Sequence, residues 1–466
     1  MLTLTHGSIL VRIIRINNWP AHLGSKDVHR YLKFQAFPLL ALVLGLLLAA
    51  PAARAADPNA ALEARVATLE SELRELKAQL AQLQIQPQRD APIAVAAAAV
   101  PSAAVPSAAA TPSSVSAAPA LSWFGYGELN YTRPAADPAR ARADVGRFVI
   151  GAGYRFDERT RLTSELEVEH AVSSSGDPGE IEVEQAYIEH DLSAGVRAQM
   201  GLFLIPSGLI NENHEPTRYY GVFRNFVETA IIPSTWREGG VGLQGNSAVG
   251  LRWDVGVTTG FDLSKWDAAS SAGIASPLGS IHQELALARA KDLSAYLALQ
   301  YTGINGLRLG GSVFAGGAGQ GTPGFAGSRV SLWETHARWQ PGAWDLAALY
   351  ARGHISNTAA LNQALAGSPT LIPEEFFGWY VEAAWRARLG RPWPLLPFVR
   401  YERFNTASGY TMLNAGSTPR PQADRMALTG GVQLQFAPGV IFKVDYVDFA
   451  HGRDGDRFDL GLGYEF

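Results

Sequence analysis

Between Leu121 and Phe466, apolar side chains recur at every second position in repeated segments of about ten residues, which turn-forming residues separate. One segment carries Met426, Leu428, Val432, Leu434 and Phe436 in alternation with Arg425, Thr429, Gln433 and Gln435. Because successive side chains of a strand point to opposite faces, each segment has one apolar face and one hydrated face. This part of the chain is therefore expected to be all-β.

A soluble β-sandwich shows the same alternation, but two features favour a membrane barrel. Aromatic residues cluster near the segment ends, as in interfacial girdles, at Trp123, Phe124, Trp333, Trp339, Trp379 and Trp385. The final segment alternates up to Phe466 and resembles the signal that bacterial outer-membrane barrels present for assembly. We therefore expect a transmembrane antiparallel β-barrel in outer-membrane lipid, with Phe466 as the signal for the barrel-assembly machinery.

The number of alternating segments predicts the size of the barrel. Sixteen segments begin near residues 122, 145, 160, 180, 195, 237, 250, 293, 306, 330, 343, 377, 396, 424, 440 and 456. An even number near sixteen within residues 121–466 is what a wide outer-membrane barrel requires.

The first 55 residues have the features of an export signal. Phe37–Ala50 is an apolar run too short to span a bilayer as a helix; Arg30 and Lys33 precede it, and Ala53–Ala55 forms a small-residue cleavage site. Residues 1–55 are thus predicted to be a signal peptide with an upstream extension, whose true translation start is hypothesised near Val28. An uncleaved membrane anchor is the alternative.

Residues 56–86 have the heptad spacing of a coiled coil. The apolar positions alternate at intervals of four and three residues at Leu62, Val66, Leu69, Leu73, Leu76, Leu80 and Leu83. Three heptads are marginal alone, so the helix is expected to self-associate, as a dimer or a trimer. A single amphipathic helix packed on its own domain is the alternative.

Residues 87–120 form an Ala/Pro/Ser-rich linker of low complexity. Its prolines favour extended polyproline II structure, which at about 3.1 Å per residue reaches roughly 100 Å. The coiled coil is therefore expected to lie well away from the barrel.

Composition and motifs exclude several classes of function. The mean hydropathy is close to zero, which excludes a helical membrane protein. The formal net charge of −4 gives no reason to expect nucleic acid, and the absence of cysteine excludes disulfides and thiolate sites. No hydrolase, metalloprotease or nucleotide-binding motif occurs. We therefore predict no catalytic residues and no cofactor. We also predict no metal site, since His214 is followed by Glu215 and Pro216 and no second histidine is suitably spaced.

The segment 203–236 lacks strand alternation and is too long for an ordinary connection. Its aromatics require cover while its charges require water, so we expect it to fold into the barrel and narrow the pore. The predicted constriction residues are Glu212, His214, Glu215, Arg218, Arg224, Glu228 and Arg237. An outward cap, or a loop at a trimer contact, is the alternative.

The strand phase assigns a set of arginines to the hydrated inner face. The predicted lumen-wall residues are Arg147, Arg155, Arg161, Arg197, Arg386, Arg388, Arg400 and Arg425, opposite Glu165, Glu167, Glu182, Glu184, Glu334 and Glu382. Opposed charges of this kind orient dipolar solutes. For each arginine, an ordinary hydrated wall position is the alternative.

The block Leu202–Leu243 is similar to the matching stretch of the phosphate-selective porin O/P family of Gram-negative outer membranes. The matching features are the Pro206-x-Gly208 turn, Val227-Glu228, Ile232-Pro233, and Trp236 before a glycine-rich strand. The resemblance implies a sixteen-stranded homotrimeric porin with loops in its lumen. Some relatives carry an N-terminal periplasmic coiled coil, which favours three strands for residues 56–86.

The expected function is passive diffusion of small polar solutes or anions across the outer membrane. Dedicated phosphate uptake is not expected, because the barrel segment has only three lysines, Lys265, Lys291 and Lys443. The alternative is a structural outer-membrane anchor for a periplasmic coiled-coil tether.

Overall fold

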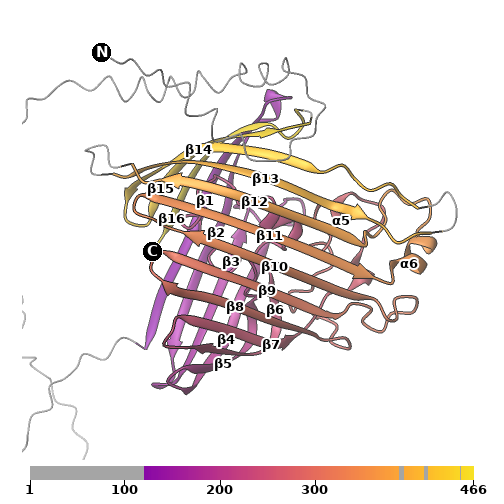
Figure 1. Ribbon diagram of the computed structural model, residues 1–466, viewed down its shortest axis with the longest axis horizontal. Coiled ribbons are helices and arrows are strands. Elements are labelled where there is room, and N and C mark those ends of the chain that lie inside the picture. Colours follow the sequence, from indigo (N-terminus) through magenta and orange to yellow (C-terminus); the bar gives the residue numbers. More distant parts are fainter. Residues whose placement is uncertain (1–119, 388–392, 414–417, 452) are drawn as a thin grey trace, which may run out of the picture. The chain divides into compact units, whose positions relative to one another are not determined.

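The computed structural model describes residues 120–466, except 388–392, 414–417 and 452. The signal peptide, the coiled coil, nearly all of the linker and Arg388 lie outside the described residues and stay predictions. The described residues form a closed barrel of sixteen antiparallel strands, in which each strand pairs with its sequence neighbours and β1 closes on β16 (Figure 1). The all-β barrel prediction is confirmed, including its strand number.

The strands are β1 Leu121–Pro134, β2 Arg142–Arg155, β3 Thr160–Glu169, β4 Ile181–Ser193, β5 Val196–Leu204, β6 Arg237–Asn246, β7 Leu251–Thr258, β8 Ser294–Ile304, β9 Leu307–Gly317, β10 Arg329–Trp339, β11 Trp344–Ser356, β12 Glu375–Trp385, β13 Leu395–Gly409, β14 Arg425–Ala437, β15 Val440–Phe449 and β16 Arg457–Glu465. Each begins within three residues of its predicted start. The helical turns are η1 Pro138–Arg140, η2 Val227–Ile231, η3 Leu263–Lys265, α5 Ala272–Ala275 and α6 Thr358–Ala364.

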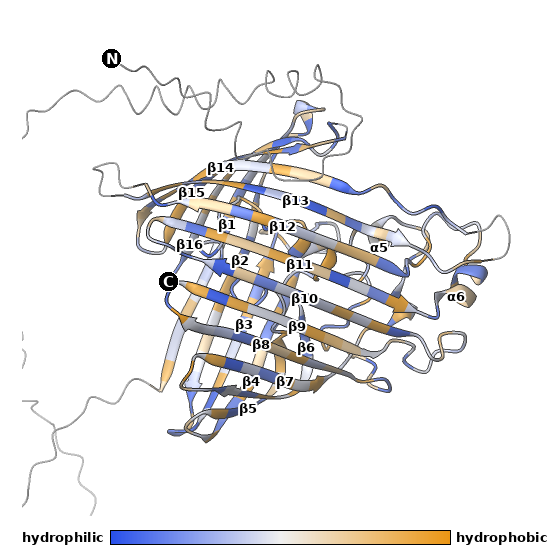
Figure 2. Cartoon of the chain, in the orientation of Figure 1, coloured by the Kyte–Doolittle hydropathy of each residue, from blue (hydrophilic) through white to orange (hydrophobic). Residues whose placement is uncertain are grey.

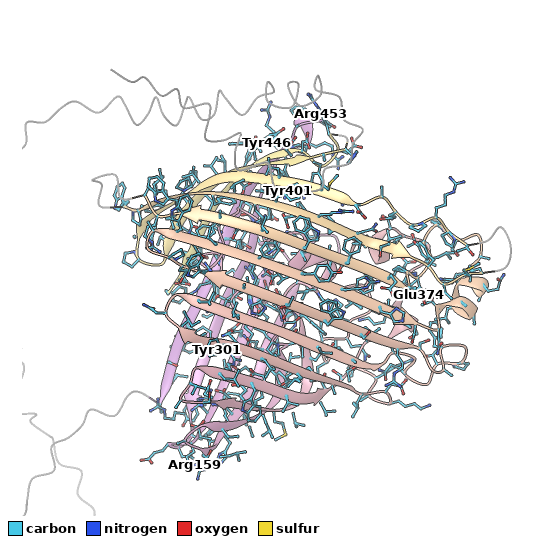
Figure 3. The ribbon with its side chains drawn as sticks, in the orientation of Figure 1. Arg159, Tyr301, Glu374, Tyr401, Tyr446 and Arg453 are labelled. Atoms are coloured by element: carbon cyan, nitrogen blue, oxygen red, sulfur yellow. The ribbon has the colours of Figure 1, made fainter. Side chains whose placement is uncertain are left out.

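The two ends of the barrel differ in the length of their connections. Apart from 386–394, every second connection is short, as at 194–195, 305–306 and 438–439, and these turns lie on one rim together with the start of β1 and the end of β16. The long connections gather on the opposite rim, where Figure 1 shows α6. Figure 3 accordingly shows Arg159 on the short-turn rim, and Glu374 and Arg453 on the long-loop rim.

Side chains alternate between the two faces of the barrel wall, as Figure 2 shows by hydropathy along the strands. On β14 and β15, Leu428 and Phe442 are exposed on the outer face, whereas Thr429, Lys443 and Asp445 are buried on the inner face. The outer face is thus a continuous apolar band, a surface that a monomeric soluble protein rarely exposes. Of the described helices, none is long and apolar enough to cross a membrane.

The apolar core lies inside the barrel, where the long connections pack on the wall. Trp236 is fully buried; its ring stacks on Phe261 at 5.4 Å and meets Phe314 edge-on at 4.6 Å. Trp236 is the last residue of the connection 205–236, and Phe261 lies in the connection 259–293. These are the two longest connections, and Phe314 lies on β9. Aromatic contacts of this kind hold the connections in place.

Replacing Gly201 by alanine is expected to impair barrel formation. Gly201 has φ +136°, and a Cβ there would lie 2.3 Å from the backbone oxygen of Ala186 on β4. The strained backbone alone costs about 1–3 kcal/mol, and the clash opposes the pairing of β4 with β5. The measurement is the fraction of heat-modifiable, folded protein on unheated gels. Gly430→Ala is the matched control, because a Cβ at Gly430 meets nothing within 4 Å; equal yields for the two variants would contradict the expectation.

Candidate functional site

The connection from β5 to β6, residues 205–236, is called the lumen loop below. Its two ends are joined by Asn211, whose Nδ2 donates to the backbone oxygens of Ile205 at 2.7 Å and Trp236 at 2.8 Å. The Asn211 Oδ1 accepts from the backbone N–H of Trp236 at 2.7 Å. Since this side chain is buried, the three hydrogen bonds fix the direction in which the loop leaves the wall.

The lumen loop contacts inward-facing side chains on widely separated strands. Glu212 pairs with Arg252 of β7 at 2.7 Å, and the Tyr220 hydroxyl donates to Asp345 of β11 at 2.7 Å. The backbone N–H of Val222 donates to Asp445 of β15 at 2.6 Å. These strands lie on different parts of the closed wall, so the loop runs across the interior of the barrel.

Glu228 is the central anchor of the lumen loop. Its Oε2 accepts from the backbone N–H groups of Leu209 and Ile210, both at 2.8 Å. Its Oε1 accepts from Asn225 Nδ2 at 3.1 Å and from the hydroxyl of Tyr380 on β12 at 2.7 Å. Burial raises the pKa of the Glu228 carboxyl above its usual range, and these hydrogen bonds act in the opposite direction. One carboxylate thus joins two parts of the loop to the wall.

His214 lies at the wall formed by β1 to β4. Its Nε2 is 2.6 Å from Glu184 Oε1 and 2.6 Å from the Tyr126 hydroxyl oxygen. Its backbone oxygen accepts a hydrogen bond from Arg147 Nη2. The histidine and both of its neighbours on the wall are buried, so this contact fixes the loop against the strands.

The other predicted constriction residues differ in their surroundings. Arg218 is 53% exposed; its guanidinium lies 3.8 Å from Glu215 and 3.3 Å from Glu465. Arg224 donates to Ser234 and Thr235 within the loop. Arg237 is instead the first residue of β6, buried, and pairs with Glu182 at 2.5 Å and Glu284 at 2.8 Å. It therefore holds the connection 259–293 and is not itself part of the lumen loop.

Five of the predicted wall arginines lie on the inner face in contact with wall residues. Arg147 pairs with Glu128, Arg161 and Arg197 both pair with Glu189 and Asp191, Arg400 pairs with Glu382 and Glu402, and the Arg425 guanidinium lies over the rings of Phe404 and Phe449. The carboxylate partners of the first four arginines offset their charge, so each of these four contributes less to the lumen than its formal charge suggests.

Two predicted wall arginines lie at the short-turn rim. Arg155 is the last residue of β2 and is exposed. The exposed Arg386 follows β12, which ends at Trp385, so its place on the lumen wall stays a prediction. The sequence phase continues past the end of the strand, which is why it assigned this residue to the wall.

Three further arginines on the inner face were missed: Arg252 on β7, Arg308 on β9 and Arg338 on β10. Arg308 and Arg338 are directly opposed in the sheet register. Arg338 binds Asp345 through two hydrogen bonds at 2.9 and 2.6 Å, and Arg252 binds Glu212. In the part of the chain that the structure describes, half-buried Arg308 has neither an ion pair nor a hydrogen bond. The phase of β9 would have identified it, had the glycines at 310 and 311 not weakened the alternation.

Comparison with known proteins agrees with the fold. No family model matches the chain. An uncharacterized protein of Aquifex aeolicus is 28% identical over 354 residues, which are 73% of this chain and 79% of that protein. The structure of OmpF from Salmonella typhi in complex with daunomycin covers 74% of this chain and 97% of its own, with 14% identity and a TM-score of 0.51. The outer-membrane channel DcaP of Acinetobacter baumannii covers 74% of this chain and 97% of its own, with 13% identity and a TM-score of 0.47. The chain therefore shares the barrel fold of OmpF.

Proposed function

We propose that this protein is an outer-membrane porin through which small polar solutes, including anions, diffuse passively. The observation that carries the proposal is the lumen loop, which crosses the interior of a closed barrel whose inner face is polar and whose outer face is apolar. A loop in this position restricts the size of solutes and brings fixed charges close to their path. The pore constriction would include Glu212, His214, Glu215, Arg218, Arg224 and Glu228.

The arrangement of charges supports a preference for anions. Arg252, Arg308 and Arg338 lie on β7, β9 and β10, within one part of the wall. Arg308 has no carboxylate partner among the described residues. A guanidinium stays charged at all relevant pH values and binds a carboxylate or phosphate with two hydrogen bonds. Dedicated phosphate uptake is not part of the proposal, because only Lys443 among the barrel lysines lies on a strand, and its Nζ donates to the backbone oxygens of Tyr219 and Gly221.

The connections support an orientation in the membrane. Outer-membrane barrels have short turns on the periplasmic side and longer loops outside. The start of β1 lies on the short-turn rim, so the preceding linker and coiled coil would lie in the periplasm. We propose a homotrimer, in which three barrels bring the helices of residues 56–86 to a high local concentration. Phe466 stays the proposed signal for the barrel-assembly machinery.

Planar-bilayer recording of the purified protein tests the proposal. We expect discrete conductance steps in groups of three, and a reversal potential in a KCl gradient that favours chloride. Liposome swelling is expected to admit small sugars and to exclude large oligosaccharides. An absence of channels in protein that is folded and heat-modifiable would contradict the porin function.

The heptads of residues 56–86 favour one alternative, a structural anchor for a periplasmic tether. Deletion of residues 57–120 separates the two functions. A porin keeps its single-channel conductance after the deletion, whereas an anchor has no conductance before or after it.

A further inference from the structure

Three side chains from separate parts of the chain converge on the inner wall beside the lumen loop. Glu165 of β3, Glu184 of β4 and His214 of the loop each offer one ligand atom, and these three atoms lie within 4.8 Å of one another. The residues are 8%, 0% and 3% exposed. Among the described residues, this is the only such group of three. Two buried carboxylates this close to one another are stabilised by a cation between them.

A β-bulge turns Glu184 toward the group. The register between β3 and β4 shifts after the pair Glu165 and Gln185, and Leu166 then pairs with Val183. Glu184 is therefore the extra residue of the bulge, and both Glu184 and Gln185 are buried on the inner face. Bulges re-aim side chains in this way and are frequent beside functional sites.

The hydrogen bonds of His214 leave Nε2 as the atom that faces the carboxylates. Its Nδ1 lies 2.8 Å from the backbone oxygen of Asn211, which can only accept, so Nδ1 carries a proton. The Nε2 atom then faces Glu184 Oε1, 2.6 Å away. Metal-binding histidines have this second interaction, in which the other ring nitrogen donates to a carbonyl or carboxylate.

Glu165 supplies an independent observation that points to a bound cation. Its Oε2 is buried and accepts no hydrogen bond from any described residue. Arg147 acts on Glu165 through its charge alone: its Nε binds Glu128 at 2.9 Å, its Nη2 binds the His214 backbone, and its Nη1 makes no hydrogen bond to a described residue. The Tyr126 hydroxyl donates to Glu184 Oε2 at 3.0 Å.

We propose that Glu165, Glu184 and His214 bind a divalent transition-metal cation, with Zn²⁺ as the best-suited ion. Two carboxylates and one imidazole are a donor set that Zn²⁺ accepts, with a fourth position left for water. In a tetrahedral site, ligand atoms about 2.1 Å from the ion lie about 3.4 Å from one another. Small movements of the three side chains would bring their ligand atoms to this spacing. The bound ion joins the lumen loop to β3 and β4.

This proposal differs from the prediction of no metal, which considered only His214 and its neighbours in the sequence. The other two ligands, Glu165 and Glu184, precede His214 by 49 and 30 positions in the sequence. The proposal does not depend on the function of the barrel as a channel, because the site consists of wall and loop residues alone.

The test uses the full-length protein without a histidine tag, with Zn²⁺ itself as the probe. After chelator treatment and dialysis, calorimetric titration is expected to give one high-affinity site per chain. Crystals soaked in Zn²⁺ are expected to show an anomalous peak between the three side chains at the zinc absorption edge. Glu165→Gln and His214→Gln are each expected to weaken binding at least about tenfold.

His336→Gln is the matched control. His336 also lies on the inner face beside a buried glutamate, with Nδ1 2.9 Å from Glu334 Oε2, but it belongs to no group of three. It is expected to leave binding unchanged. Glu165→Gln keeps the test decisive if His214→Gln fails to fold, since Glu165 Oε2 makes no hydrogen bond. No binding by the wild type, or equal binding by Glu165→Gln and His336→Gln, would overturn the proposal.

Discussion

Replacing Glu228 by alanine is expected to free the lumen loop from the wall and to widen the pore. The substitution leaves four buried donors without their acceptor: two backbone N–H groups of the loop, the Asn225 amide and the Tyr380 hydroxyl. Each unsatisfied donor costs about 1–3 kcal/mol, so the inward position of the loop loses most of its advantage. Single-channel conductance should rise, and liposome swelling should admit oligosaccharides that the wild type excludes.

Glu215→Ala is the matched control for this prediction. Glu215 is a second carboxylate of the loop, but its nearest cationic partner, Arg218, is 3.8 Å away, and its Oε2 accepts no hydrogen bond from the described residues. Its removal should leave the loop in position, so the size-exclusion limit should stay near the wild-type value. If Glu228→Ala keeps the wild-type exclusion limit while it stays folded, the loop is held by other contacts, of which Asn211 and His214 are the strongest.

The sequence predicted the barrel well, because one physical constraint acts on every strand. Lipid on one side and water on the other impose a period of two, and this period holds from β1 to β16 whatever each strand contacts. On β14, for example, the phase alone assigned Leu428 to the apolar face and Thr429 to the hydrated face, and the structure has them on the outer and the inner face. Turn residues then set the ends of the strands to within a few positions.

The interior was harder to predict, because its contacts join residues that are far apart in sequence. Glu228 and Tyr380 are separated by 152 positions, and Tyr220 and Asp345 by 125. Absence of alternation indicated that 203–236 is not a strand, but no periodicity records which wall residues it meets. The bulge at Glu184 is a second example, since one extra residue changes the phase of all later residues on β4.

Charge reversal at Arg308 is expected to shift the selectivity of the channel strongly toward cations. The guanidinium has no acidic partner in the described structure and is directly opposed in register to Arg338. Arg308→Glu therefore removes the uncompensated positive charge and adds a negative one beside the permeation path. In a narrowed lumen, where the effective dielectric constant is lower than in water, such a change acts strongly on passing ions. Reversal potentials in asymmetric KCl measure the shift.

Arg329→Glu introduces the same change of charge on the same sheet, at an exposed position on the outer phase of β10 near the long-loop rim. It should leave the reversal potential unchanged and so separates a local effect at Arg308 from a general effect of net charge. A larger shift at low than at high ionic strength is also expected, because salt screens the field of the substituted residue. If Arg308→Glu and Arg329→Glu give the same reversal potential, ions pass along another part of the lumen. The exposed Arg218, at the other side of the loop, then becomes the residue whose charge reversal should govern selectivity.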